Sequence, residues 1–279
     1  MIEQILILFP LILGAYISFS LLKVPDLSLE SAYVFGAAAA AQAAHFPFPL
    51  PFLAAMIGGA LVGCLASLLN QGLKIPFLLA AVITNGFFHG AVQYVLGSSL
   101  LSLGGAKNPL LIFGVNELLP LALIGLALLL AVHLLLRSEM GGALSVYGNN
   151  PHFFGHHRIS TRYVVVAGVV IADMLAGLSG YLFALSNGFV DLMMGFGLVL
   201  AAITSLILGK MLVASKKATP LIPLAGVCAY YGVQQALLSI GLNLTYFNAF
   251  QALFVLAALL FLMRKEKRGT KAFANHLGV

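Results

Sequence analysis

Apolar residues run in long stretches along this chain, separated by short polar breaks. A helix needs about 20 apolar residues to cross the hydrocarbon core of a bilayer. Nine stretches meet this need and predict membrane-spanning helices, with eight to ten as the range of the count. They cover residues 4–22, 30–46, 51–70, 75–96, 117–136, 163–186, 192–213, 219–240 and 245–263. The second is short and alanine-rich, which favours a broken or tilted helix.

The composition supports the same environment. The 279 residues are 61% hydrophobic and 8% charged, and the mean hydropathy is +1.06. A soluble domain carries about 25% charged residues, because its surface faces water. We therefore expect an all-α, multi-pass membrane protein surrounded by a lipid bilayer. The net charge of +6 reflects membrane topology on this interpretation, and no nucleic-acid partner is expected.

The distribution of lysine and arginine predicts an orientation, since these residues concentrate in cytoplasmic loops. If residues 137–162 are cytoplasmic and the spans alternate outward from them, all of the 14 lysines and arginines except Lys107 lie inside. We therefore expect the inner (plasma) membrane, with residues 137–162 and the basic tail 264–279 in the cytoplasm. Glu3, Glu117 and Asp191 would lie outside.

Two segments hint at an internal repeat. "KVPDLSLESAYVFGAAAA" leads into the second predicted helix, and "GFVDLMMGFGLVLAAI" leads into the seventh. The offset of five helices is odd, so the two copies would point in opposite directions, as inverted repeats in transporters do. A single transmembrane domain, 1–279, would then hold a first repeat at about 1–136 and a second at about 163–263. Chance recurrence of Asp-Leu and Pro at helix ends is the competing explanation.

Motifs for chemistry are absent from the sequence. It contains no G-x-x-x-x-G-K-[ST] loop, no H-E-x-x-H and no C-x-x-C, so we expect no enzymatic activity and no cofactor on this chain. His152, His156 and His157 lie close together, but no carboxylate or thiolate nearby completes a usual set of metal ligands. No metal site is therefore predicted.

Ionisable residues inside apolar helices are costly and are candidates for function. Asp173 lies about eleven residues into the sixth predicted helix. It is a candidate pathway or gate residue, or else it makes a structural hydrogen bond between helices as a neutral or paired acid. Asp26 and Glu30 lie at the start of the second helix, where Asp26 follows Pro25 and is favoured as a helix cap.

Asn85, His89 and Gln93 form a polar stripe at i, i+4 and i+8 of the fourth predicted helix. Such a stripe faces protein or a water-filled cavity instead of lipid. Both a pathway lining and plain packing against a neighbouring helix remain open for it.

The segment "ALSVYGNNPHFFGHHRIS", residues 143–160, interrupts the apolar pattern near the middle of the chain. From the residues alone it is a connector, a metal site or a surface that another protein contacts.

Three stretches carry a resemblance to a known family. "VPDLSLESAYVFGAAAAA", "YGNNP" and "GLSGYLFALSNGFVDLMMGFGLVLAAITSLILGKML" together resemble permease subunits of bacterial ATP-binding-cassette (ABC) importers, in the group of branched-chain amino acid and ribose permeases. The pattern is most similar to tryptophan/tyrosine-type permeases, and it covers about residues 20 to 215.

The resemblance implies a translocation pathway for a small solute such as an amino acid, formed by a dimer of permeases. The implied partners are an ABC ATPase subunit, which would bind ATP and Mg²⁺, and an extracytoplasmic solute-binding protein. The central segment resembles a coupling helix that docks on the ATPase, with Asn150 as its cap and Pro151 in its first turn. The residues implied in coupling are Tyr147, Asn149, Asn150, Pro151, His152, Phe153, Phe154, His156, His157 and Arg158.

The chain departs from the family pattern at two positions. Arg158 stands where a glycine is usual, and Asp173 stands where relatives often have asparagine. A secondary transporter driven by an ion gradient is the alternative function, with Asp173 as its proton or sodium site.

Overall fold

The computed structural model describes residues 1–103, 117–150, 153–154, 160–213, 218–241, 249–257 and 260. By its internal contacts the chain divides into two compact units, residues 1–231 and residues 232–279. In the second unit the described residues comprise the end of one helix, up to Ser239, and a helical stretch at 249–257. The candidate site lies entirely in the first unit.

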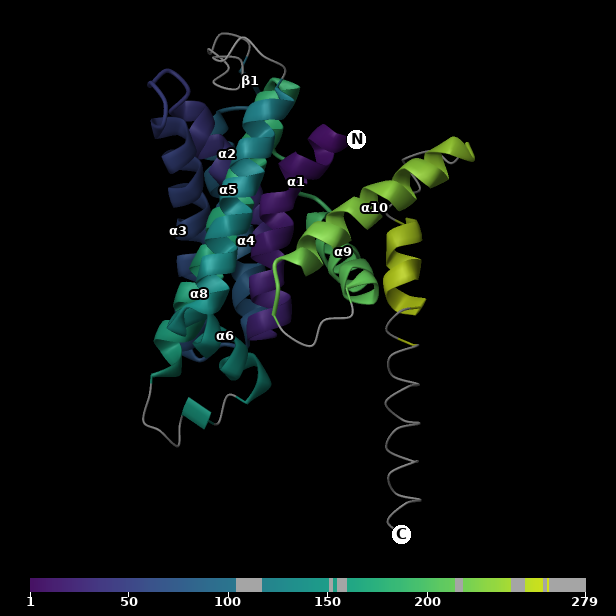
Figure 1. Cartoon of the computed structure of the whole chain (residues 1–279). Helices are drawn as coiled ribbons and strands as arrows, with labels where there is room; N and C mark the ends of the chain where they lie inside the picture. The colour runs from purple at the N-terminus through teal and green to yellow at the C-terminus, as the bar shows by residue number, and fades with distance from the viewer. Residues whose placement is uncertain are drawn as a thin grey trace. The chain divides into compact units, whose positions relative to one another are not determined.

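Besides the helical stretch at 249–257, the described residues form ten helices and one two-stranded sheet (Figure 1). The helices are α1 (Ile2–Ala15), η1 (Tyr16–Leu22), α2 (Leu29–Gln42), α3 (Leu50–Leu73), α4 (Phe77–Leu96), α5 (Leu118–Arg137), α6 (Glu139–Asn149), α8 (Thr161–Asn187), α9 (Leu198–Leu212) and α10 (Leu221–Ser239). The strands β1 (Leu100–Ser102) and β2 (Phe189–Asp191) pair antiparallel. The predicted helical class is therefore confirmed, with this small sheet as an addition.

Six segments are long and apolar enough to cross a membrane among the described residues. They are Ile2–Leu22, Leu50–Leu73, Phe77–Leu96, Leu118–Arg137, Thr161–Asn187 and Leu221–Ser239. They match six of the nine predicted spans closely. The ninth prediction, 245–263, lies only partly within the described residues.

Two predicted spans are shorter than expected. The stretch 30–46 becomes α2 with 14 residues, and 192–213 becomes α9 with 15. At 1.5 Å per residue these helices are about 21 Å long, below the roughly 30 Å of the hydrocarbon core. The cause is local: α2 ends before prolines 47, 49 and 51, and α9 begins only after Gly197, whose φ is +82°. Both short helices follow a non-helical stretch inside the fold.

Segments that the sequence analysis placed on the same side of the membrane lie together at the same end of the first unit. The Lys23 ammonium donates a hydrogen bond to Asn149 Oδ1 at 2.8 Å, so the first predicted inner loop lies beside the central segment. The Ser186 hydroxyl donates to the Glu3 carboxylate, which places the start of α1 beside the end of α8. Figure 1 shows α6 and β1 at opposite ends of the bundle in this unit.

Helix α8 is the centre of this unit, and it packs most extensively against α3, α2 and α1. Small residues at the crossings allow the backbones to touch. A Cβ added to Gly177 would lie 2.5 Å from the carbonyl oxygen of Ala55 on α3, and one on Gly180 would collide with the carbonyl oxygen of Tyr33 on α2. Because lipid tails are as apolar as leucine, such close packing holds membrane helices together where a hydrophobic driving force is missing.

We expect Gly177→Ala to destabilise the protein by about 1–3 kcal/mol, because the added methyl forces α3 and α8 apart. The matched control is Gly90→Ala on α4, where an added Cβ meets nothing within 4 Å. The control should leave stability unchanged or raise it, since alanine favours helix more than glycine does. Thermal unfolding of both variants in detergent measures the difference. Equal melting temperatures would contradict the assigned role of Gly177.

Candidate functional site

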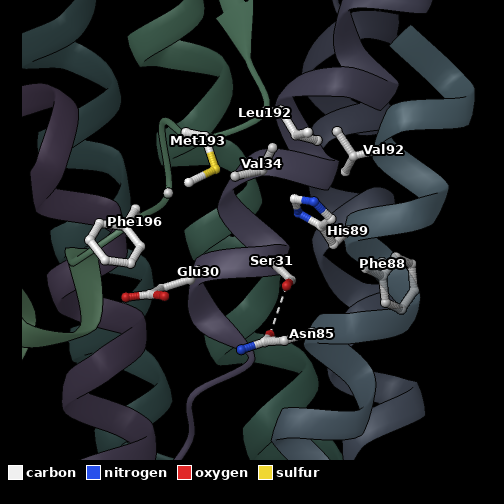
Figure 2. Close-up of a pocket in the computed structure, with 11 residues that line it drawn as sticks. Glu30, Ser31, Val34, Asn85, Phe88, His89, Val92, Leu192, Met193 and Phe196 are labelled. Atoms are coloured by element: carbon white, nitrogen blue, oxygen red, sulfur yellow. Dashed lines mark hydrogen bonds between the residues drawn. The ribbon is translucent and has the colours of Figure 1, made fainter. Parts of the chain in front are cut away.

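A cavity of about 150 Å³ lies where α2, α4 and the turn before α9 meet. Figure 2 shows the side chains that face it, with the ring of His89 extending from α4 toward α2. The lining comprises Glu30, Ser31 and Val34 of α2, Asn85, Phe88, His89 and Val92 of α4, and Leu192, Met193, Gly195 and Phe196 of the turn. A mainly apolar wall with a few polar groups is typical of small-molecule sites.

Glu30 links α2 to the beginning of α9. Its Oε1 accepts hydrogen bonds from the backbone N–H groups of Gly197 at 3.1 Å and Val199 at 3.2 Å. These N–H groups have no partner within their own helix, and the N-terminus of a helix favours a negative charge. The carboxylate of Glu30 therefore serves as the cap of α9, supplied by a residue 167 positions away.

The turn before α9 also touches the backbone of α2. A Cβ added to Gly195 would lie 2.7 Å from the carbonyl oxygen of Glu30. The N-terminal ends of the two short helices consequently meet at one wall of the cavity.

A second link joins α2 to α4. The Ser31 hydroxyl donates to Asn85 Oδ1 at 2.7 Å, and Asn85 Nδ2 donates to the carbonyl oxygen of Leu27 at 3.0 Å. Asn85 and His89 both line the cavity, as one interpretation of the polar stripe expected. Gln93, the third member, is exposed and does not belong to the lining.

Asp26 and Asp173 lie outside this cavity and close to each other. Both side chains are fully buried, and the Ser28 hydroxyl lies between them. It donates to Asp26 Oδ1 and lies 3.0 Å from Asp173 Oδ2. Asp26 also accepts hydrogen bonds from the Ser18 hydroxyl and the Ser28 N–H, each at 3.0 Å.

The sequence analysis favoured Asp26 as the cap of α2, but the cap position lies two residues later, at Ser28. Ser28 occupies the cap position of α2, and its side chain makes no capping hydrogen bond to the helix. Asp26 instead accepts the N–H of Ser28 two residues on, an arrangement in which an aspartate closes a tight turn. Ser18 and Ser28 did not stand out in the sequence, since a serine hydroxyl gives no pattern.

Helix α6 covers the first part of the central segment and ends where the predicted coupling helix, with Asn150 as its cap, would begin. Ser138 caps this helix by accepting the N–H of Gly141, and Asn150 follows its last residue. The Asn150 carbonyl then accepts the N–H of Phe153 at 3.1 Å. A Cβ on Gly148 would collide with the carbonyl oxygen of Leu21, so α6 lies directly against η1. The end of the first span and α6 are thus in direct backbone contact.

The two phenylalanines of the segment differ in exposure. Phe154 is buried at 4% exposure, with its ring 6.2 Å from Tyr147 and 5.8 Å from Phe153, whereas Phe153 is 41% exposed. Burial raises the pKa of the Tyr147 hydroxyl, which keeps this group neutral. Phe154 is therefore an internal packing residue, and of the pair Phe153 is the exposed one.

The remaining predicted coupling residues, Pro151, His152, His156, His157 and Arg158, lie outside the described residues. Within the described part of the chain, no group of three or more histidine, cysteine, aspartate or glutamate side chains is placed to hold a metal ion.

Comparison with known proteins gives a consistent result. The family described as branched-chain amino acid transport system / permease component matches residues 1–263. An uncharacterized protein of Rickettsia prowazekii is 32% identical over 210 residues, covering 75% of each chain. A tyrosine transport system permease protein of Clostridioides difficile is 29% identical over 212 residues, which cover 74% of this chain and 70% of that protein.

A more distant relative is the autoinducer 2 import system permease of an Enterobacter species. It is 29% identical over 168 residues, which cover 59% of this chain and 48% of that protein. No solved structure matches the chain.

Proposed function

Because the chain belongs to the family of permease components of branched-chain amino acid transport systems, we propose that its cavity is part of a solute pathway driven by a separate ATPase subunit. The chain is a permease component of an ABC importer, which is a non-catalytic role. ATP and Mg²⁺ would bind to the ATPase partner, and a solute-binding protein would deliver the solute from outside. The single structural observation that supports the location of the pathway is the meeting of α2 and α9.

The two short helices provide the first line of support. Unusually short or interrupted helices in corresponding positions of two halves are the best pointer to a transporter's binding site. Here α2 and α9 are the helices that the two similar segments of the candidate repeats lead into, and their N-terminal ends face each other across Glu30.

The lining favours a small zwitterionic solute, and we propose an amino acid. Phe88, Val92 and Phe196 supply apolar surface, while Glu30 and His89 supply polar groups on the opposite sides of the cavity (Figure 2). A carboxylate and an imidazole separated by apolar side chains can contact both ends of such a molecule. The relative named as a tyrosine transport permease is consistent with this class.

For coupling, we propose that the segment 137–162 contacts the ATPase subunit in the cytoplasm. Closure of the ATPase dimer upon ATP binding would displace this segment. Because Gly148 lies against Leu21 and Asn149 accepts a hydrogen bond from Lys23, the displacement would pass directly to η1 and then to α1. Two permeases would pair around the pathway, which would open alternately to the two sides.

The cavity's part in transport can be tested by filling it. His89→Trp places a larger ring in the cavity, and we expect ATP-driven uptake into proteoliposomes to fall at least about tenfold, because the solute and the indole cannot occupy one small space. Phe87→Trp, on the same helix but 63% exposed and outside the lining, is the matched control and should keep uptake. Normal uptake by a stably assembled His89→Trp complex would exclude this cavity from the pathway.

The coupling proposal makes a prediction for Phe153. Truncating an exposed aromatic anchor costs about 2 kcal/mol of binding, or roughly a 30-fold weaker complex. Phe153→Ala should therefore insert normally but lose the ATPase subunit on purification. Phe46→Ala, which truncates another exposed phenylalanine, between α2 and α3, is the control and should retain it. Wild-type recovery of the ATPase with Phe153→Ala would separate this residue from coupling.

Phe154→Ala is expected to act differently. Removing a buried phenylalanine costs about 3–5 kcal/mol of stability, so this variant should lower the melting temperature of the permease itself.

The proposed orientation predicts which side of the membrane each end faces. In a background with Cys64 and Cys228 replaced by alanine, Asn150→Cys should react with an impermeant maleimide only after the cytoplasmic face is opened. Ser98→Cys, near β1, should react in intact cells. Both positions are exposed in this chain, and the permease is labelled without its ATPase partner so that sidedness decides the access to them. The opposite labelling pattern would reverse the topology.

A further inference from the structure

In the Asp26–Ser28–Asp173 cluster, two hydrogen bonds meet at the Ser28 hydroxyl, which has only one proton to donate. Ser28 Oγ lies within hydrogen-bond distance of both carboxyl groups. A serine hydroxyl carries one proton and can donate it only once. With both aspartates ionised, one of the two contacts would place a lone pair of Ser28 Oγ against a negatively charged oxygen. One carboxyl group must therefore supply a proton of its own.

The surroundings of the two aspartates differ in their donors. Asp26 accepts from the Ser18 hydroxyl, the Ser28 N–H and the Ser28 hydroxyl, and a backbone N–H can only donate. Three donors on one carboxyl group stabilise its ionised form. The two hydroxyls can also accept, but the Ser28 N–H can only donate, so Asp26 has an obligate donor that Asp173 lacks. Asp26 is thus the ionised member.

Asp173 lacks comparable support. Its Oδ2 has the single contact to Ser28, and its buried Oδ1 has no hydrogen-bond partner. The neighbouring helix α3 presents Gly59 and Gly63, which have no side chains to donate, and a Cβ on Gly63 would lie 3.0 Å from Oδ2. The titratable group that faces Asp173 is Asp26, a second acid. An ionised carboxylate without partners costs far more to bury than a neutral acid does.

We propose that Asp173 is a neutral carboxylic acid that donates its proton to Ser28 Oγ, while Ser28 donates to the ionised Asp26. The proton completes a chain of hydrogen bonds from the middle of α8 to the residues that precede α2. Asp173 is therefore a positioning residue: it fixes Ser28, the residue before α2, two positions from Glu30. The assignment rests on the buried cluster and holds whatever solute the cavity admits.

The experiment compares amide substitutions at the two positions in the full-length chain. Asparagine at 173 presents an N–H to Ser28 Oγ, as the neutral acid does, so Asp173→Asn should keep the melting temperature in detergent. Asparagine at 26 puts an N–H donor where three donors already point, so Asp26→Asn should melt lower. Asp173→Ala, which removes the donor, should also melt lower and thereby show that the contact matters.

Infrared spectroscopy supplies a measurement that packing alone would not move. In a detergent free of ester groups, the carbonyl stretch of a protonated carboxyl group should be present in the unchanged chain. This signal should lose the Asp173 contribution in Asp173→Asn and retain it in Asp26→Asn.

Three results would overturn the proposal. The first is a reversed pattern, with Asp26→Asn stable and Asp173→Asn destabilised. The second is a protonated-carboxyl band that Asp173→Asn leaves unaltered. If Asp173→Asn does not fold, the unchanged chain still decides, because absence of any protonated-carboxyl band in its spectrum excludes a neutral Asp173.

Discussion

The close approach of backbones around α8 is the constraint on which the rest of the first unit depends. Helices surrounded by lipid gain nothing from hiding apolar side chains, so they associate through van der Waals contact and hydrogen bonds. Gly36, Gly59 and Gly177 allow α2, α3 and α8 to touch without intervening side chains. At such distances a carbonyl oxygen of one helix contacts a Cα of the next, and a single methyl group has no room. The position of α2 is therefore constrained by its backbone contact with α8.

Polar interactions then fix the N-terminal ends of the two short helices, α2 and α9. Glu30 caps α9, and the Asp26–Ser28–Asp173 cluster fastens the chain that enters α2. Each interaction joins segments more than 140 residues apart in the sequence. Both satisfy hydrogen-bonding groups that would otherwise be exposed to a medium without water, where an unpaired group costs several kcal/mol. The irregular backbone near the cavity is tolerated because protein surrounds it.

The sequence predicted the long helices well and the short ones poorly. Hydropathy located Phe77–Leu96 within two residues, because a long apolar run admits few alternatives in lipid. It overestimated α2 and α9, where apolar residues continue past the helix into proline- and glycine-containing turns. The same pattern cannot distinguish an apolar residue in a helix from one in a buried turn.

For the site, the sequence identified costly polar residues without their partners. Glu30, Asn85 and His89 do line one cavity, since an intramembrane polar group must face protein or water. That Asp26 and Asp173 share Ser28 depends on the packing of α2 against α8, which no local pattern encodes. The sequence did not predict the burial of Phe154 against Tyr147 for the same reason.

The small sheet has a consequence for how this region can vary. β1 follows α4, and β2 precedes the turn that leads to α9, so the pair ties together two walls of the cavity at one end. The tie is made of main-chain hydrogen bonds, extended by Leu103 N–H to the Gly188 carbonyl at 2.8 Å and by Leu192 N–H to the Ser99 carbonyl at 3.0 Å. Main-chain bonds do not depend on side-chain identity. Substitutions in the lining can therefore alter which molecule fits, while the distance between these two walls at that end stays the same.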